Sequence, residues 1–404
     1  MGSLPKRQKV ALNAVCGIIL AIIRLFYHKL LTLKTKTVMK IFKLLLYAAT
    51  VSLLATACGD DSDDDDPIGP GPVEGQCYGF YLLNRGVDGE EASLEYFDFS
   101  DYTMSQGWWT LKNTAVEYLG DWGVDVVAHE DYVLATFNDS EWMEICTRTG
   151  EHLNFVEIPS CRRIVASEGF AYVSSYADVT KAPIRNGHVA KVDIEKGLVT
   201  EVCSVGRKPE GLAIIGDKLY VLNTGDWTIQ ESSISVIDLK SFTEIEQVNI
   251  GNIYAGGALT VMPDGHSLFI NSCNASYTDP GKSVIFDTNT LSVTHEFKQG
   301  SKYAAVYKDK LYALDTYYFP MTSSDVVSGF VYDAATDTVF DFPVSSEILE
   351  TISDPSGLWI HPTEGDVYIA DGENNKLFRF DLAGTLKGTY DTGFYPTQLA
   401  WDIR

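Results

Sequence analysis

Tyrosine, tryptophan and arginine side chains gather in the longer connections between predicted β-strands, and ligand binding is the chemistry that they suit best. Examples are YLGDWGVD around Trp122, NTGDWTIQESS from Asn223 and TGFYPT around Tyr395. Exposed Tyr and Trp rings give large, rigid contact areas with a polar tip that can hydrogen-bond to a ligand. From these connections we predict a ligand-binding set: Trp122, Tyr176, Arg207, Asn223, Trp227, Tyr254, Tyr277, Tyr303, Tyr317, Tyr318 and Tyr395.

Each member of this set has a structural alternative. Any one of the rings could pack beneath a loop instead of facing a ligand. Five arginines lie in or beside the same connections, and they could either bind an anionic group of a ligand or neutralise nearby acids. The arginines are Arg85, Arg162, Arg163, Arg185 and Arg207, and the acids include Asp121, Asp226 and Glu210.

The strands that would position these loops form a repeat. Seven segments resemble one another: GFYLLNRG, DYVLATFND, FAYVSSYAD, KLYVLNTGD, SLFINSCNA, KLYALDTYY and DVYIADGEN. Their aromatic residues, from Tyr81 to Tyr368, recur at intervals of 40 to 56 residues, which brackets the length of about 40 to 50 expected for one four-stranded propeller blade. In the fourth unit, GLAIIG, KLYVLNTG, SISVIDL and TEIEQVNI have the alternation of four strands. We therefore predict an all-β, seven-bladed β-propeller, with a solenoid or sandwich as the alternative.

The two ends of the repeat complement each other. YPTQLAWD at Tyr395 has the inner-strand pattern of KPEGLAII at Lys208 and DPSGLWIH at Asp354, yet the chain has no further strands after Asp402. The first unit, at Gly79, has no inner strand before it. We therefore expect the C-terminal strand to complete the first blade, which leaves no unpaired edge where the ring closes.

The predicted binding loops belong to one face of this fold. The connection into each inner strand and the connection between the second and third strands open on the same face, and these are the long aromatic segments. Connections on the opposite face, such as DLKSFT, DTNTLS and DIEKGL, are short. Functional residues concentrate in loops that a rigid scaffold holds together.

Signals for catalysis or metal binding are weak. No histidine has a helical ligand spacing or lies beside a nucleophile motif, and no C-x-x-C pair occurs, so we predict neither a metal site nor a cofactor. His188 in RNGH is one candidate, because propeller lyases place a histidine on this face; a structural histidine is the alternative. DGENN at Asp371 has the composition of a calcium loop, but a tight surface turn explains it too. The sequence leaves carboxylate pairs for glycoside cleavage open.

The N-terminal segment has the pattern of an export signal. In MKIFKLLLYAATVSLLATAC, lysines precede an apolar run and small residues before Cys58. This segment resembles the lipobox of bacterial lipoproteins, which implies acylation of Cys58; an ordinary secretory signal is the alternative. Met39 is the expected start of translation, and the alternative is a membrane helix before it. The expected organisation is a leader at 1–57 (1–38 upstream of the start, 39–57 the signal peptide), a tether at 58–75 and the propeller at 76–404.

The segment after Cys58 is strongly acidic. The run DDSDDDD cannot be desolvated in a core, so it is expected to be a solvated tether. It resembles the acidic signal of surface-exposed lipoproteins in the Bacteroidota, which implies display on the outer face of the outer membrane. The whole chain has a formal net charge of −24, which repels phosphate backbones and excludes nucleic acid as the main partner. Pairing stays open for the remaining cysteines: Cys77, Cys146, Cys161, Cys203 and Cys273.

Three segments carry a wider resemblance: YGFYLLNRGVDGEEASLEYFDF, RKPEGLAIIGDKLYVLNTGD and DPSGLWIHPTEGDVYIADGENNKLFRFDLAGTLKGTYDTGFYPTQLAW. They resemble a family of Bacteroidota surface lipoproteins with seven-bladed propellers, which is YncE-like and includes the BtuG type. The resemblance covers essentially the whole chain after the leader. BtuG-type members capture cobalamin and act as a lid on a TonB-dependent outer-membrane transporter. The opening strand departs from the family, because Arg85 stands where an acidic residue is common.

The resemblance implies a lipid-anchored cell-surface protein that is not an enzyme and that captures a small-molecule ligand, with cobalamin (vitamin B12) as the first candidate. It also implies transfer of this ligand to a TonB-dependent outer-membrane transporter. A second possibility keeps the binding role but changes the ligand to a siderophore, haem or a glycan. A propeller lyase or hydrolase is a third possibility, and an adhesion or assembly protein is a fourth.

Overall fold

The computed structural model describes residues 75–86, 89–116, 118–178, 186–225, 230–251, 255–272, 282–319 and 324–404. The chain divides into two compact units, Met1–Gly71 and Pro72–Arg404, and every described residue belongs to the second. Cys58, the predicted lipidation site, lies outside the described residues. Neither helix within the described ranges is long and apolar enough to span a membrane.

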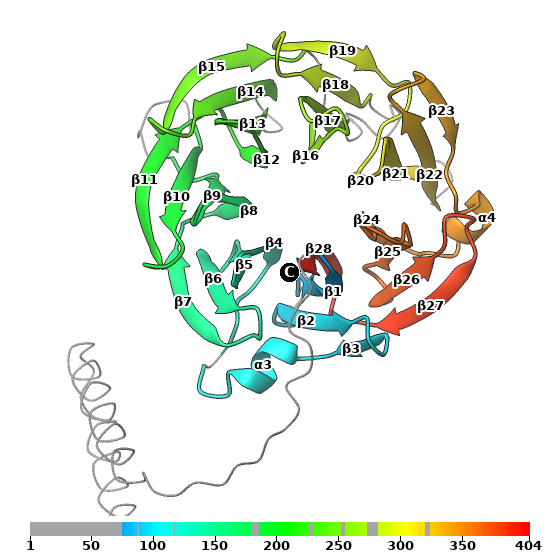
Figure 1. The fold of residues 1–404 in the computed structure, drawn as a ribbon, viewed down its shortest axis with the longest axis horizontal. Coiled ribbons are helices and arrows are strands. Elements are labelled where there is room, and N and C mark those ends of the chain that lie inside the picture. Colours follow the sequence, from blue (N-terminus) through cyan, green and yellow to red (C-terminus); the bar gives the residue numbers. More distant parts are fainter. Residues whose placement is uncertain are drawn as a thin grey trace, which may run out of the picture. The chain divides into compact units, whose positions relative to one another are not determined.

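Seven four-stranded antiparallel sheets surround one axis, so the second unit is the predicted seven-bladed β-propeller (Figure 1). From the axis outward, blade 1 contains β28 (Pro396–Ile403), β1 (Cys77–Asn84), β2 (Ser93–Asp98) and β3 (Thr103–Ser105). Blade 2 contains β4 (Gly123–His129), β5 (Tyr132–Phe137), β6 (Trp142–Thr147) and β7 (His152–Glu157). Blade 3 contains β8 (Cys161–Ser167), β9 (Phe170–Ser175), β10 (His188–Asp193) and β11 (Leu198–Ser204).

The remaining blades follow the same order. Blade 4 contains β12 (Pro209–Ile215), β13 (Lys218–Gly225), β14 (Gln230–Asp238) and β15 (Thr243–Asn249), and blade 5 contains β16 (Ala255–Val261), β17 (Ser267–Ser272), β18 (Val284–Asp287) and β19 (Ser292–Glu296). Blade 6 contains β20 (Tyr303–Tyr307), β21 (Lys310–Phe319), β22 (Ser324–Asp333) and β23 (Thr338–Asp341). Blade 7 contains β24 (Pro355–Ile360), β25 (Val367–Asp371), β26 (Lys376–Phe380) and β27 (Leu386–Asp391). Two short helices, α3 (Trp108–Lys112) and α4 (Ser346–Leu349), lie in connections.

The hydrophobic core lies between adjacent blades, as β13 illustrates. Its Leu219 and Val221 pack toward blade 3, whereas Tyr220 and Leu222 pack toward blade 5. Successive side chains of a strand point to opposite faces, and both faces of this strand are covered. Because burying a Val or Leu side chain contributes about 1.5 to 3 kcal/mol, a continuously apolar strand is favoured at this position.

The C-terminal strand closes the ring as predicted. β28 pairs antiparallel with β1, so that Leu399 lies opposite Leu82. At the far end of β28, the fully buried carboxylate of Asp402 accepts hydrogen bonds from Tyr96 Oη at 2.9 Å and from Arg148 Nη1 at 2.8 Å. Arg148 follows β6, so this ion pair also joins blade 1 to blade 2.

The inner strands share an irregular start that aims side chains at the axis. Trp122, Ser160, Lys208 and Tyr395 each precede an inner strand and have φ between 47° and 61°. The register of the pairing then shifts within the first residues of β4, β8 and β12. A left-handed conformation is uncommon for residues other than glycine, and its recurrence at equivalent positions marks a built feature of the fold.

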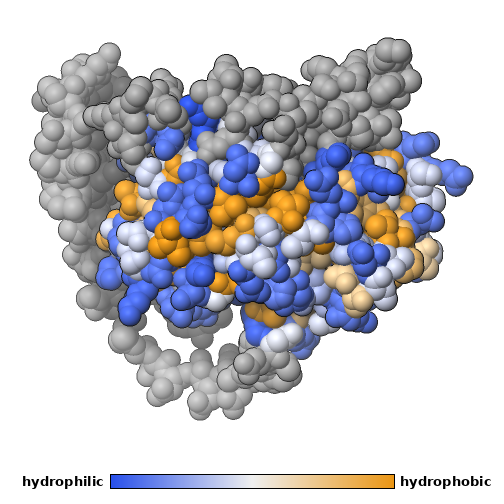
Figure 2. Space-filling model, turned by 90° about the horizontal axis from the view of Figure 1, so that it is seen from above, coloured by the Kyte–Doolittle hydropathy of each residue, from blue (hydrophilic) through white to orange (hydrophobic). Residues whose placement is uncertain are grey.

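The outer wall of the propeller is mixed in polarity. Seen from the side, exposed apolar residues lie among polar ones (Figure 2). Large exposed apolar side chains on the outermost strands include Val202 in β11, Ile245 in β15 and Phe340 in β23. Such scattered exposure is normal for a propeller, whose outer strands pair on one side only.

Candidate ligand-binding face

The starts of the inner strands and the ends of the second strands meet on one face, where the sequence predicts the long connections. Five backbone hydrogen bonds tie the residue before an inner strand to the end of a second strand: Arg85 N–H to Tyr395 O, Asn138 N–H to Trp122 O, Tyr176 N–H to Ser160 O, Thr224 N–H to Lys208 O and Gly372 N–H to Asp354 O. We call this side of the propeller the loop face. Its rim is held by the backbone, so the side chains there start from fixed positions.

A cavity of about 530 Å³ occupies the channel at the centre of the ring and is lined by all seven inner strands. Its charged lining residues are Arg85, Asp125, Arg163 and Lys302. Further along β4, β8, β12 and β16, away from the loop face, a second cavity of about 350 Å³ has a mostly apolar lining. The polar chemistry of the channel is therefore concentrated at its loop-face end.

Small or uncharged residues occupy, in other blades, the position that carries a charge in blades 2 and 3. The position that Asp125 occupies in blade 2 and Arg163 in blade 3 corresponds to Gly211 in blade 4, Gly357 in blade 7 and Gln398 in blade 1. A Cβ added to Gly211 would come within 2.7 Å of the backbone nitrogen of Leu259 in the next blade. Glycine therefore allows the inner strands to approach closely, while blades 2 and 3 supply the charges.

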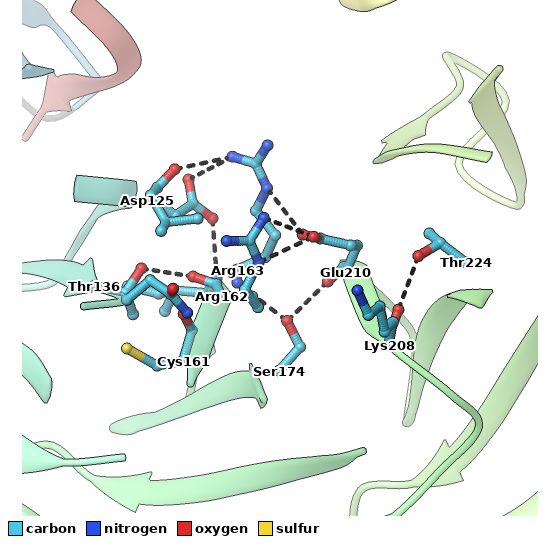
Figure 3. Close-up of polar contacts among 12 residues, drawn as sticks. Asp125, Thr136, Cys161, Arg162, Arg163, Ser174, Lys208, Glu210 and Thr224 are labelled. Carbon is cyan, nitrogen blue, oxygen red and sulfur yellow. Dashed lines mark hydrogen bonds and ion pairs between the residues drawn. The ribbon is translucent and has the colours of Figure 1, made fainter. Parts of the chain in front are cut away.

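Blades 3 and 4 share a charged network at the cavity wall (Figure 3). Arg162 donates to Glu210 Oε1 from Nε at 2.9 Å and from Nη2 at 2.7 Å, and the Tyr176 hydroxyl donates to the same oxygen. The Arg162 guanidinium also lies 4.8 Å from the centroid of the Tyr176 ring. Arg163 is held more loosely, 3.7 Å from Asp125 and 3.9 Å from Glu210.

The carboxylate of Asp125 is fixed by the backbone. Its oxygens accept the N–H groups of Val126 at 3.0 Å and Ile164 at 2.9 Å. Burial raises the pKa of Asp125, and the charge of Arg163 together with these two hydrogen bonds opposes that rise. Asp125 therefore lies between blades 2 and 3, held by backbone N–H groups and 3.7 Å from Arg163.

Arg85 is held between two of the predicted aromatic residues. Its guanidinium carbon lies 3.7 Å from the ring centroid of Tyr395 and 4.8 Å from that of Trp122. The Tyr395 hydroxyl donates to Asp354 Oδ2 at 2.6 Å. Burial, together with this hydrogen bond and the Asp354 charge, raises the pKa of Tyr395 to about 12. Stacking of this kind orients a guanidinium without consuming its N–H donors.

Blade 6 contributes Lys302 and Tyr303. The ammonium nitrogen of Lys302 lies 5.3 Å from the centroid of the Tyr303 ring. The backbone carbonyl of Lys302 accepts a hydrogen bond from Asn271 Nδ2 at 2.8 Å, which ties the start of β20 to blade 5. Burial raises the pKa of Tyr303, while the charges of Lys302 and Arg163 act in the opposite direction.

The structure brings part of the predicted ligand-binding set together. Tyr303 lines the cavity, Trp122 and Tyr395 enclose Arg85 at its edge, and Tyr176 stacks on the network beside it. Trp227, Tyr254 and Tyr277 lie outside the described residues. Tyr317 and Tyr318 belong to β21, opposite Val326 and Asp325 of β22, and their side chains are outside the described part.

Two members of the predicted set do not face the cavity. Asn223 is fully buried, and its Nδ2 donates to Ser233 Oγ at 3.0 Å and Ser235 Oγ at 2.9 Å. It therefore secures the end of β13, and direct contact of Asn223 with a ligand stays a prediction. Arg207 is also buried, with 8 % of its surface exposed, and it is absent from the cavity lining.

The other candidate residues, His188 and Asp371, make hydrogen bonds within the fold. His188 is buried, and its Nδ1 lies 2.8 Å from the carbonyl oxygen of Ala177; burial lowers its pKa. Asp371 accepts the backbone N–H groups of Ser353, Asp354 and Asn374, which is the geometry of a tight turn. Within the described residues, no cluster of His, Cys, Asp and Glu could hold a metal ion. The four described cysteines, Cys77, Cys146, Cys161 and Cys203, are free thiols.

Two charged residues of the cavity, Lys302 and Asp125, are absent from the predicted set. Lys302 directly precedes β20, and Tyr303 pairs with Leu314 as Gln398 pairs with Leu83, so Lys302 lies at the start of an inner strand. Asp125 interrupts the apolar strand GVDVVAH, and a lone acid within an inner strand is a signal for an axial position.

No protein-family model and no curated protein matches the sequence. Solved structures do match. A candidate 6-phosphogluconolactonase from Bacteroides fragilis is 12% identical with a TM-score of 0.56, over 85% of this chain and 99% of its own. A protein from Lactobacillus plantarum is 14% identical with a TM-score of 0.54, over 81% and 99% respectively. Hydrazine synthase from Kuenenia stuttgartiensis is 14% identical with a TM-score of 0.55, over 69% and 89%.

Identities this low show a shared fold only, so the function has to be inferred from the geometry and chemistry of the site. The chain is a seven-bladed β-propeller. Its central cavity combines cationic and aromatic side chains at the loop face.

Proposed function

We propose that this propeller binds a small-molecule ligand on its loop face and does not transform it. The observation that carries the proposal is the arrangement of Trp122, Tyr176, Tyr303 and Tyr395 around and beside one central cavity, each next to a cationic side chain. Cavities of about 300 to 1,000 Å³ are typical of small-molecule sites, and Tyr and Trp rings are typical of binding surfaces.

Cobalamin is the first candidate ligand, because the sequence resembles that of cobalamin-capturing surface lipoproteins. A corrin ring offers an apolar plane edged with amides. The plane would lie on the rings of Trp122 and Tyr395, and the amide edge would meet the charged network around Glu210. Acylation of Cys58 would hold the protein at the outer membrane, where a shared anchoring surface raises its effective concentration near a TonB-dependent transporter.

Calorimetric titration of the protein with cyanocobalamin tests this proposal. We expect saturable one-to-one binding, and we expect Trp122→Ala to weaken it about 30-fold, which corresponds to about 2 kcal/mol. Phe340→Ala is the matched control, because it removes an exposed ring from the outer strand β23. Heat that saturates equally in wild type and Trp122→Ala would place the ligand elsewhere. No heat with cyanocobalamin, but heat with a siderophore, haem or a glycan, would retain capture and replace the ligand.

Hydrolysis is the second candidate function. It is favoured by two carboxylates, Asp125 and Glu210, that flank Arg163 at the cavity wall. The fold neighbour described as a candidate 6-phosphogluconolactonase suggests a phosphorylated lactone as the first substrate to test. Turnover of this lactone that disappears in Glu210→Gln would favour the enzyme, whereas an unchanged background rate would favour capture. A protein that binds no small molecule at all would instead fit an adhesion or assembly role.

A further inference from the structure

We propose that the loop-face end of the central cavity is an oxyanion-binding subsite in which Arg85, Arg163 and Lys302 bind a phosphate or carboxylate group. The inference rests on the proposed function for the location of the ligand, and it adds the kind of chemical group that the ligand carries. Three further observations support it. Cations outnumber acids in the cavity lining, the cations have no carboxylate at hydrogen-bond distance among the described residues, and the nearby acids already accept other hydrogen bonds.

The charge balance of the cavity is opposite to that of the protein. Arg85, Arg163 and Lys302 face a single acid, Asp125, among the lining residues, although the whole chain has a formal net charge of −24. A cleft that carries one sign of charge between low-dielectric walls focuses the field and attracts ligands of the opposite sign. Cations at this one place in an acidic protein are therefore suited to an anionic group.

The charges of the three cations affect the pKa values of two tyrosines that line or border the cavity. The charges of Arg85 and Lys302 both act to lower the pKa of Tyr395, against the effect of burial, which dominates. The charges of Lys302 and Arg163 act in the same way on Tyr303, whose pKa burial raises. The three cations therefore line one cavity and have two tyrosines as common neighbours.

The donors of Arg85 and Lys302 are not used by acids. Within the described part of the chain, neither side chain has a carboxylate oxygen within 4.0 Å. The Nε of Arg85 is buried and has no hydrogen-bond partner among the described residues. Stacking on Tyr395 and Trp122 holds this guanidinium in place, which reduces the entropy lost when a ligand binds.

Arg163 is also available, because both of its acidic neighbours are too far for a close ion pair. The separations of 3.7 Å from Asp125 and 3.9 Å from Glu210 contrast with 2.7 Å between Arg162 and Glu210. Its Nη1 donates to the Val124 carbonyl at 3.1 Å, and its Nε has no hydrogen-bond partner among the described residues. In Figure 3 the guanidinium of Arg163 extends past both acids, away from the strand that carries it.

The acids near the cavity already accept hydrogen bonds from other groups, apart from Glu210 Oε2, which has no hydrogen-bond partner among the described residues and lies 3.9 Å from Arg163 Nε. Asp125 accepts two backbone N–H groups, Glu210 Oε1 accepts from Arg162 and Tyr176, and Asp354 accepts from Tyr395. Charge-assisted hydrogen bonds to an oxyanion are about twice as strong as neutral ones. Lys302 also has a side-chain hydrogen bond with Tyr303. An incoming phosphate or carboxylate would therefore meet three cations that, within the described part of the chain, have no carboxylate oxygen at hydrogen-bond distance.

The test is titration of the full chain with inorganic phosphate, followed by broadening of the phosphorus-31 resonance, and with acetate, followed by saturation transfer to its methyl protons. We expect at least one anion to bind saturably and its affinity to fall at least tenfold in Arg163→Gln and in Lys302→Gln, in line with the loss of about one charged hydrogen bond. Lys240→Gln, in the exposed β14–β15 turn on the opposite face, removes the same charge and should bind as wild type. Thermal unfolding establishes that each variant is folded.

The outcomes separate the two proposals, because cobalamin is absent from this experiment. Anion binding that both cavity variants lose supports the subsite, whether or not cyanocobalamin binds. Anion binding that survives both substitutions, or that Lys240→Gln weakens equally, overturns it. Absence of saturable binding of either anion up to about 50 mM, which corresponds to less than about 2 kcal/mol of affinity, also overturns it.

Discussion

The guanidinium carbon of Arg85 lies 3.7 Å from the ring centroid of Tyr395, and the backbone N–H of Arg85 donates to the carbonyl of the same tyrosine at 2.8 Å. Arg85 follows β1 and Tyr395 precedes β28, which are the two strands that close the ring. The contact between Arg85 and Tyr395 therefore joins the two strands that close the ring, which we call the seam, and holds a cation at the edge of the central cavity.

Replacing Arg85 should destabilise the seam. We expect Arg85→Ala to lower the free energy of unfolding by about 1 to 2 kcal/mol, because two stacking contacts are lost. Urea denaturation measures this change. Lys308→Ala, which removes a single exposed stacking contact on Tyr307, is the control and should cost about 0.5 kcal/mol or less. Equal effects of the two substitutions would mean that Arg85 contributes nothing special to closure.

The ion pair between Asp402 and Arg148, at the far end of β28, should contribute more to the free energy of unfolding than the Arg85 contact. Asp402 is fully buried, and Asp402→Asn would leave the guanidinium of Arg148 without its carboxylate. We expect a loss of about 3 to 5 kcal/mol, measured by urea denaturation. Asp391→Asn breaks an exposed pair with Lys376 and should cost about 1 kcal/mol or less. A loss at Asp402 no larger than that at Asp391 would contradict a role for the buried pair in closure.

Glu95 should make stability depend on pH. Burial raises its pKa to about 7, so the folded state keeps a proton that the unfolded chain has lost between about pH 4.5 and 7. The free energy of unfolding should therefore fall as pH rises through this window, by about 3 kcal/mol in all. Asp315, with a pKa raised to about 6, acts in the same direction.

Urea denaturation between pH 4.5 and 8 measures this dependence. Glu95→Gln cannot ionise, so its curve should be flatter than that of wild type, with a residual slope from Asp315. Parallel curves for the two proteins would show that Glu95 has the same pKa in both states.

His188 should affect stability and not ligand binding. Its buried ring and its contact with the Ala177 carbonyl indicate that His188→Ala costs about 2 kcal/mol of unfolding free energy. The affinity for a loop-face ligand should stay within about twofold of wild type, since the ring is not part of the cavity lining. A folded His188→Ala protein that has lost a measurable turnover would instead favour the lyase interpretation.

The repeat made the fold predictable from the sequence. Alternating apolar residues in segments such as KLYVLNTG determine strands, and the displaced copy at YPTQLAWD determines the closure, because both are local patterns. The same patterns identified the loop face, since it follows from the order of the strands within a blade.

The composition of the site was harder to predict. Asn223 and Trp122 both belong to aromatic-rich connections, yet one is buried in a hydrogen-bond network and the other is 38 % exposed. What separates them is their position: Asn223 lies within β13, whereas Trp122 directly precedes β4 and has a left-handed backbone. The contribution of Lys302 depends on contacts between blades that are far apart in the sequence, which no local pattern reports.

The most direct test of loop-face capture is the position of cobalt in crystals of the protein grown with cyanocobalamin, located by anomalous scattering at the cobalt absorption edge. We predict one cobalt site above the mouth of the central cavity, with the corrin plane against the rings of Trp122, Tyr303 and Tyr395. A cobalt site on the outer wall or on the opposite face, or crystals in which no cobalt is bound, would contradict the account.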